Sequence, residues 1–212
     1  MYKRQYTNSS NNTLKQYGDL PIVGLQVRRQ PILKVLDTVL RVISLGSFDP
    51  KKYGGYDKMY HLFMVITVKL SDGKRKDILV EKNQSINISS SIPKVVPETE
   101  RLTIAIPSQL NLTLNSMLNK TLEKVGMTQY FVYDPFTNNC QRFITDILDT
   151  NQLNGDRYRQ WILQDITELT KKLPQYTKTF AKGVTDFASF GEKLLGMGKK
   201  KVLKRDLKRY RL

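Results

Sequence analysis

The chain is poor in cysteine and histidine. Its 212 residues include a single cysteine, Cys140, and a single histidine, His61. One cysteine excludes an intrachain disulfide, and one Cys with one His cannot complete a zinc cage built from these ligands. The sequence also lacks a P-loop, a dinucleotide-binding glycine fingerprint, a zinc-binding helix motif and carboxylates at metal-ligand spacing. We therefore expect no nucleotide hydrolysis, no metal catalysis and no cofactor.

Long apolar runs and acidic residues are also scarce. No apolar stretch reaches the ~18 residues of a membrane span, and the polar first twenty residues contain no visible signal peptide. We therefore expect an intracellular, cytoplasmic protein that is not secreted. Lys and Arg number 35 against 19 Asp and Glu, a formal net charge of +16. This excess favours a polyanionic partner, whether nucleic acid, an anionic membrane or an acidic protein surface.

The apolar pattern predicts an α+β fold, because a helix is followed by several strands in a meander and then by further helices. We divide the chain into a polar, partly disordered arm (1–28), an α+β domain (29–172) and an amphipathic, basic tail (173–212). The expected helices span 31–45, 109–125, 139–150 and 156–172, and Gly126 is expected to end the second. The expected strands span 60–70, 76–82, 86–89 and 102–106, with a turn at 71–74.

Three residues are candidates for chemistry. Cys140 begins a predicted helix, where backbone N–H groups stabilise a thiolate. His61 opens a predicted strand and is the one imidazole that could pair with this thiolate and move its proton. Glu81, near the end of the next strand, could hold the far ring nitrogen. The simpler alternatives are a buried structural cysteine, a hydrogen-bonded rim histidine, and a glutamate that faces solvent on an edge strand or pairs with Lys or Arg.

The hairpin between these strands bears on whether His61 and Glu81 can meet. If the Asp72-Gly73 turn lies midway, Glu81 faces a residue near Met64 and His61 faces one near Gln84. The two candidates are then about three positions out of register. Their pairing would require a bulge or a longer loop.

The segment Asn139-Cys140-Gln141-Arg142-Phe143-Ile144 resembles the Asn-Cys-x-x-Phe-Val/Ile nucleophile motif of permuted papain-like proteins. These are relatives of the NlpC-type peptidases, and they include the lecithin:retinol acyltransferase-like and PPPDE deubiquitinase-like groups. Their His strand precedes their Cys helix, as His61 precedes Cys140 here, and Tyr60-His61-Leu62 is similar to the start of that strand.

The resemblance covers about residues 56–150. It implies an antiparallel sheet packed on the Cys-bearing helix, with Cys140 as nucleophile, His61 as base and Glu81 as third polar residue. The acyltransferase-like group carries a second His that this chain lacks. The Asn/Lys/Ile-rich composition with a basic tail also resembles proteins of large DNA viruses that carry this fold, which would make the protein virion-associated.

The C-terminal tail has chemistry of its own. Residues 173–212 carry 11 Lys or Arg against 3 Asp or Glu. Their net charge of +8 is half of the chain's +16. Its apolar residues recur at nearly helical spacing, which suits either an amphipathic helix on a membrane or one packed on protein. The final segment could bind anionic membrane or nucleic-acid phosphates, or serve only as a solvated or targeting segment. Its cationic residues are Lys199, Lys200, Lys201, Lys204, Arg205, Lys208, Arg209 and Arg211.

Three functions compete at this stage. The first is a thiol hydrolase or acyltransferase that acts through Cys140 and His61 on an amide, ester or thioester of a peptide, lipid or ubiquitin-like substrate. The second is a non-catalytic virion structural protein that binds membrane, genome or a capsid protein through its tail. The third is a basic nucleic-acid-binding module without chemistry. We favour the enzyme.

Overall fold

The computed structural model describes residues 6–31, 60–93, 97–134 and 137–163. Five strands form one sheet in the order β4-β3-β2-β1-β5, and every neighbouring pair is antiparallel. The elements are α1 (Asn8–Tyr17), β1 (Ile22–Pro31), β2 (Tyr60–Lys69), β3 (Arg75–Lys82), β4 (Ile86–Ser89), β5 (Glu100–Thr103), α3 (Leu114–Phe131), α4 (Cys140–Thr150) and α5 (Gly155–Ile162). The expected α+β class, with an antiparallel sheet, is confirmed.

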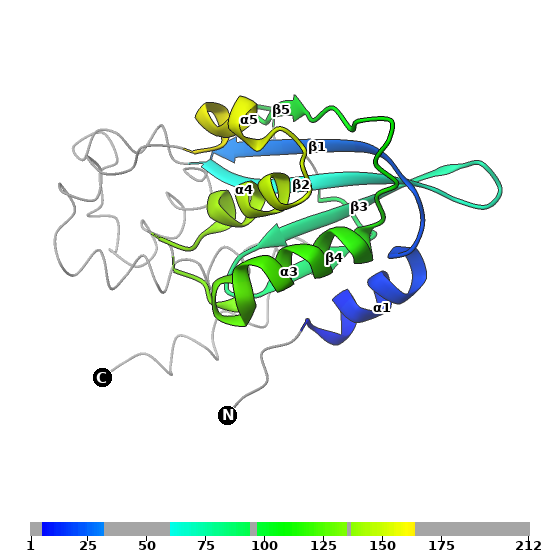
Figure 1. Cartoon of the computed structure of the whole chain (residues 1–212), viewed down its shortest axis with the longest axis horizontal. Coiled ribbons are helices and arrows are strands. Elements are labelled where there is room, and N and C mark those ends of the chain that lie inside the picture. The colour runs from blue at the N-terminus through cyan, green and yellow to red at the C-terminus, as the bar shows by residue number, and fades with distance from the viewer. Residues whose placement is uncertain (1–5, 32–59, 94–96, 135–136, 164–212) are drawn as a thin grey trace, which may run out of the picture.

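The helices α3 and α4 lie side by side across one face of the sheet (Figure 1). Strand alternation places Leu62, Met64 and Ile66 of β2 on this face, and each is 0% exposed. They form one large apolar core with the inner stripe of α4, which includes Phe143 and Ile147. The other face of β2 and β3 carries a smaller cluster of Phe63, Val65 and Leu79.

The β2–β3 hairpin turns through three residues, Ser71, Asp72 and Gly73. Leu70 N–H donates to Lys74 O at 2.8 Å, and Gly73 N–H donates to Leu70 O at 3.0 Å. Gly73 has φ +80°, a conformation that L side chains rarely adopt, which suits a three-residue hairpin loop. The predicted turn is therefore present, but its centre is Asp72 rather than the Asp72–Gly73 bond.

The expectation of a polar, partly disordered arm at 1–28 is wrong from residue 8 onward. α1 begins after the N-cap Thr7, and β1 lies between β2 and β5 inside the sheet. α1 contacts β4 through the buried hydroxyl of Ser10, and its Leu14 and Tyr17 pack against the main core. The Ser10 hydroxyl donates to Ile86 O at 3.3 Å and accepts from Ile88 N–H at 3.0 Å, so it completes backbone hydrogen bonds at the outer edge of β4.

Most other expected elements are present, with shifted bounds. The strands at 60–70, 76–82 and 86–89 are confirmed. The strand expected at 102–106 corresponds to β5, which begins two residues earlier and ends three residues earlier. α3 begins at Leu114 rather than 109, because Thr113 and Ser116 form a capping box there. Gly126 does not end this helix: it forms a kink with φ +79°, after which the helix resumes to Phe131.

Several expectations fall on parts of the chain that the structure does not describe. The helix expected at 31–45 lies outside the described residues, apart from Pro31, which ends β1. The helix expected at 156–172 corresponds to α5 over its first part, and the rest lies outside. The tail at 173–212 lies wholly outside. No helix within 6–31, 60–93, 97–134 and 137–163 has the length and apolarity needed to cross a membrane.

Candidate active site

Three chain segments converge at one end of the molecule: the first residues of β2, the last residues of β3 and the start of α4. In Figure 1 all three lie on the left, opposite the β2–β3 hairpin. They carry His61, Glu81 and Cys140 respectively. The structure therefore brings the three sequence-derived candidates to the same end of the sheet.

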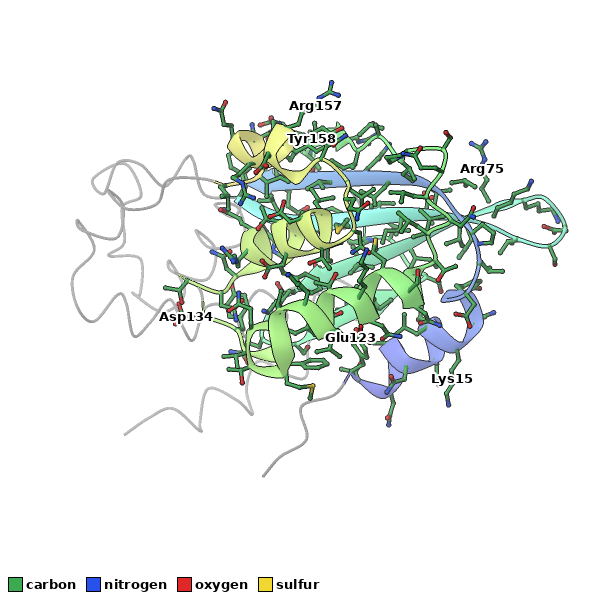
Figure 2. The ribbon with its side chains drawn as sticks, viewed as in Figure 1. Lys15, Arg75, Glu123, Asp134, Arg157 and Tyr158 are labelled. Atoms are coloured by element: carbon green, nitrogen blue, oxygen red, sulfur yellow. The ribbon has the colours of Figure 1, made fainter. Side chains whose placement is uncertain are left out.

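Cys140 is the first residue of α4 and is 7% exposed. The side chain of the N-cap residue Asn139 accepts hydrogen bonds from the amides of Gln141 and Arg142, which fixes the first turn. Asp134 and Asn138 exchange two backbone hydrogen bonds of 3.0 and 3.1 Å just before the helix. Figure 2 shows Asp134 at this end of the molecule. The cysteine is thus held in a defined position by the loop and the helix cap.

The Cys140 sulfur meets β2 where the β2–β3 ladder ends. The last ladder pair is Met64–Val80, so the amide of Leu62 lies beyond it, and hydrogen bonding from this amide helps to lower the pKa of the Cys140 thiol. His61, the preceding residue on β2, lies close enough to the thiol for its hydrogen bond and its charge to lower the pKa of Cys140. His61 lies on the face of β2 that is turned away from α4. It can still approach the Cys140 sulfur, because β3 is no longer paired with β2 at this point.

His61 is held from its other side by Glu81. The Nε2 atom of His61 lies 2.9 Å from Oε2 of Glu81, and the two side chains are 18% and 3% exposed. Because Nε2 is bonded to the carboxylate, Nδ1 is the ring nitrogen left for the sulfur. The imidazole also stacks on Phe63, with ring centroids 6.1 Å apart. The alternatives for Glu81, an exposed edge position or a Lys or Arg partner, are both wrong, since β4 covers β3 and the partner is His61.

The His61–Glu81 contact corrects the expected hairpin register. The three-residue loop makes Met64 face Val80 rather than Glu81. Continued by one residue, this register sets Glu81 level with Phe63, and His61 then lies on the diagonal of the same face. Diagonal neighbours stand about 7–8 Å apart, within reach of long side chains. The β2–β3 ladder contains no bulge, and none is needed.

Asn87 completes the arrangement and was not among the candidates. Its Nδ2 donates to Oε1 of Glu81 at 2.9 Å, so each carboxylate oxygen has its own donor. Asn87 lies directly opposite Glu81 in the β3–β4 ladder. Ser10 bonds the backbone on both sides of Asn87, at Ile86 and Ile88. The alternating pattern of the short β4 strand gave no signal that one of its polar residues faces a buried carboxylate.

Burial and pairing shift the pKa values of Cys140, His61 and Glu81 in opposite directions. Burial raises the pKa of the Cys140 thiol, but the hydrogen bond and charge of His61, with the amides of Leu62 and Gln141, hold that pKa below its ordinary value. Burial lowers the pKa of His61, but Cys140 and Glu81 hold it well above the ordinary value. Burial raises the pKa of Glu81, but His61 and Asn87 keep it low. Pairing therefore favours the thiolate of Cys140, the imidazolium of His61 and the carboxylate of Glu81 over their neutral forms.

Lys82 is a fourth ionisable group at the site, and it also escaped the sequence analysis. It follows Glu81 on β3 and is only 1% exposed. Its Nζ donates to Gln129 O and to Oδ1 of Asn138, both at 2.9 Å. Burial lowers its pKa to about 8, against the opposing charges of Asp146 and Cys140. The only sequence signal for Lys82 is that successive side chains of a strand point to opposite faces of the sheet. Lys82 therefore lies on the face opposite Glu81, which is the face that the helices cover.

The site is thus a buried Cys–His–carboxylate arrangement on an antiparallel α+β fold. Comparison of the chain with protein-family models, with curated proteins and with solved structures found no match. Among the described residues, no group of three or more His, Cys, Asp or Glu is placed to hold a metal ion. The functional argument therefore depends on the geometry of these side chains.

Proposed function

We propose that this chain is a cysteine hydrolase or acyltransferase of the permuted papain-like type, with Cys140 as nucleophile and His61 as its acid and base. The observation that carries the proposal is one chain of contacts. His61 lies close enough to the Cys140 thiol to lower its pKa through a hydrogen bond and its charge, and the same ring forms a 2.9 Å hydrogen bond with a carboxylate that is 3% exposed. Nucleophile, base and orienting group in this order are the arrangement required for acyl transfer.

The chemistry follows from these positions. The Cys140 thiolate attacks a carbonyl carbon, and the carbon–sulfur bond forms as the carbonyl becomes an oxyanion. The backbone N–H of Cys140, at the start of α4, would supply one donor for that oxyanion. His61 then gives its proton to the leaving group as the bond to that group breaks. Water, or a second acceptor, attacks the thioester after His61 removes its proton, and the thiolate is restored.

Glu81 and Asn87 have a supporting role in this mechanism. The carboxylate accepts the Nε2–H of His61, so it fixes the ring with Nδ1 toward the sulfur and stabilises the imidazolium. Asn87 donates to the remaining carboxylate oxygen and so restrains its rotation. A buried carboxylate without these two donors would be costly, which is why the three side chains act as a unit.

An activated ester tests the proposal even though the natural substrate is unidentified. Incubation of the full chain with p-nitrophenyl acetate should release nitrophenolate and leave one acetyl group on the protein, seen by intact-mass spectrometry and mapped to Cys140. Cys140→Ser and His61→Ala should show neither a burst of nitrophenolate nor the acetyl adduct. Because Cys140 is the only cysteine, a thioester adduct can be assigned without ambiguity.

Two controls define the interpretation. Thr67→Ala alters the same face of β2 near the hairpin and should leave acetylation unchanged. Acetylation of wild type and His61→Ala at equal rates would contradict the proposal, because the thiol would then be reacting without its base. Acetylation confined to lysine residues would contradict it equally.

A further inference from the structure

Lys82 is a buried cation that the proposed reaction does not use. Its side chain enters the space between the end of α3 and the start of α4, on the helix side of the sheet. Gln129, one of its two acceptors, lies in the last turn of α3, and Asn138, the other, lies two residues before Cys140. The ring of Phe143, one turn into α4, lies 5.6 Å from Nζ. The Lys82 ammonium therefore links the end of α3 to the loop that leads into Cys140.

The loop before Cys140 is held at this point by Asn138 as well. Its Nδ2 donates to the carbonyl oxygens of Gln129 and Val132, both at 2.8 Å, while its Oδ1 accepts from Lys82. Asn138 is 8% exposed. Lys82 and Asn138 thus share the Gln129 carbonyl, and together they fix where the chain enters α4. Displacement of this loop would move the cysteine that follows it.

We infer that Lys82 is a positioning residue of the Cys140 site: it anchors the loop that carries the nucleophile and supplies a positive charge that favours the thiolate. This inference rests on the proposed thiol chemistry of Cys140. A purely structural alternative is also available, because a lysine at the end of α3 neutralises the carbonyl ends of that helix. That alternative predicts a loss of stability but no change in the ionisation of Cys140.

The charges around Lys82 define what its removal should do. Asp146 of α4 and the Cys140 thiolate favour the ammonium, while Asp146 is also bound by Arg142, whose Nε lies 3.0 Å from Oδ1. His61 and Glu81 form a separate pair, 2.9 Å apart. Once the Lys82 charge is removed, His61 is the cation that still stabilises the thiolate. The thiol should then ionise at higher pH.

The test is the pH profile of iodoacetamide alkylation of Cys140 in the full chain. Lys82→Met should slow alkylation at pH 6 by about three- to tenfold, the effect expected from the loss of one nearby unlike charge. Lys82→Arg, which keeps the charge, should restore most of the rate, and Lys82→Gln, which keeps a donor only, should not. Lys69→Met, at an exposed lysine of β2, is the matched control and should match wild type.

A second measurement does not depend on whether the Lys82 variants fold. The side-chain ¹³Cε shift of Lys82 is followed with pH by NMR in wild type and in Cys140→Ala. Because the thiolate supports the ammonium, its removal should lower the pKa of Lys82 from about 8. Coupling between two titrating groups is reciprocal, so this shift must accompany the shift of the thiol.

The outcomes separate the two proposals. A reactive wild type with an unaltered Lys82→Met profile, or an unchanged Lys82 titration in Cys140→Ala, overturns the role of Lys82 and leaves the proposed function standing. A wild type that reacts at pH 6 no faster than free cysteine overturns the proposed function, and the inference with it. Slower alkylation in Lys82→Met, rescue in Lys82→Arg and a lowered Lys82 pKa in Cys140→Ala together support it.

Discussion

Two polar pairs join β2 to β3 on the same face of the sheet, one at each end of the hairpin. Near the turn, Thr67 Oγ1 donates to Asp77 Oδ1 at 2.6 Å in an exposed position. At the open end, His61 and Glu81 are 2.9 Å apart and largely buried. The small apolar cluster of Phe63, Val65 and Leu79 lies between the two pairs.

The two pairs differ most in their access to water: the longer hydrogen bond, at 2.9 Å, is the buried one. Water screens the charge of Asp77, so its bond to Thr67 has little influence on neighbouring groups. Glu81 cannot be solvated in the same way, and its charge acts on His61 and, through that ring, on Cys140. One hairpin thus carries an exposed pair of directly opposite residues near its turn, and a buried diagonal pair beside a thiol where the ladder ends. Substitutions at the two ends should therefore have unequal effects.

The largest effect is expected for His61→Ala, measured as the rate of iodoacetamide alkylation at pH 6. An ordinary thiol is ionised to well under about 1% at this pH, whereas the paired thiol is favoured as thiolate. Part of the gain is offset because a thiolate of low pKa is a weaker nucleophile. We expect alkylation to fall by about 10- to 100-fold and its pH profile to move into the ordinary thiol range. Equal profiles for wild type and variant would remove His61 from the site.

The next effect is expected for Glu81→Gln, measured as the free energy of unfolding. Loss of the charge weakens a buried charge-assisted hydrogen bond, which costs about 2–3 kcal/mol at pH 7. The folded pKa of Glu81 is depressed. Its stabilisation is therefore present above the ordinary carboxyl pKa and is lost as pH falls through the folded value. The difference between wild type and Glu81→Gln should shrink over that acid range, and a difference that stays constant there would contradict the assignment.

A smaller effect is expected for Asn87→Ala. This change removes one donor from a carboxylate that keeps its bond to His61, so we expect a loss of about 1–2 kcal/mol in the free energy of unfolding. The alkylation rate at pH 6 should change less than in Glu81→Gln, because the His61–Glu81 pair remains. Urea unfolding and alkylation on the same preparations measure both. An Asn87→Ala rate as low as that of His61→Ala would mean that the carboxylate depends on Asn87 for its position.

The smallest effect is expected at the other end of the hairpin. Asp77→Asn removes an exposed charge from the Thr67 pair, and we expect a change of less than about 0.5 kcal/mol in the free energy of unfolding. The alkylation profile of Cys140 should not move. If Asp77→Asn and Glu81→Gln destabilised the protein equally, the contrast between the exposed and buried pairs would be lost.

The sequence predicted the central hairpin because its signals are local. The apolar run from Tyr60 and the Asp72-Gly73 turn each act over a few residues, and both elements form where expected. The N-terminal elements were missed because their signals are weak. α1 packs through the hydroxyl of Ser10 on the backbone of β4, and the alternation of β1 is broken by a register shift between Ile22 and Gly24.

The candidate site could be predicted only in part. The helix predicted from residue 139 placed Cys140 at a helix start, and its single histidine partner was clear from composition. The register could not be derived, because it depended on a loop of three residues instead of two, which shifts the facing residue by one. Asn87 and Lys82 carry no sequence signal, since their roles arise from a carboxylate and a loop that lie 6 and 56 residues away.

The most direct test of the account is the ultraviolet absorbance of the Cys140 thiolate, titrated with pH in wild type and in His61→Ala. The single cysteine makes the signal unambiguous. We predict that the wild-type thiolate forms below the ordinary thiol range and that His61→Ala returns its formation to that range. A wild-type thiolate that forms only in the ordinary thiol range, with no difference from His61→Ala, would contradict the proposed pairing.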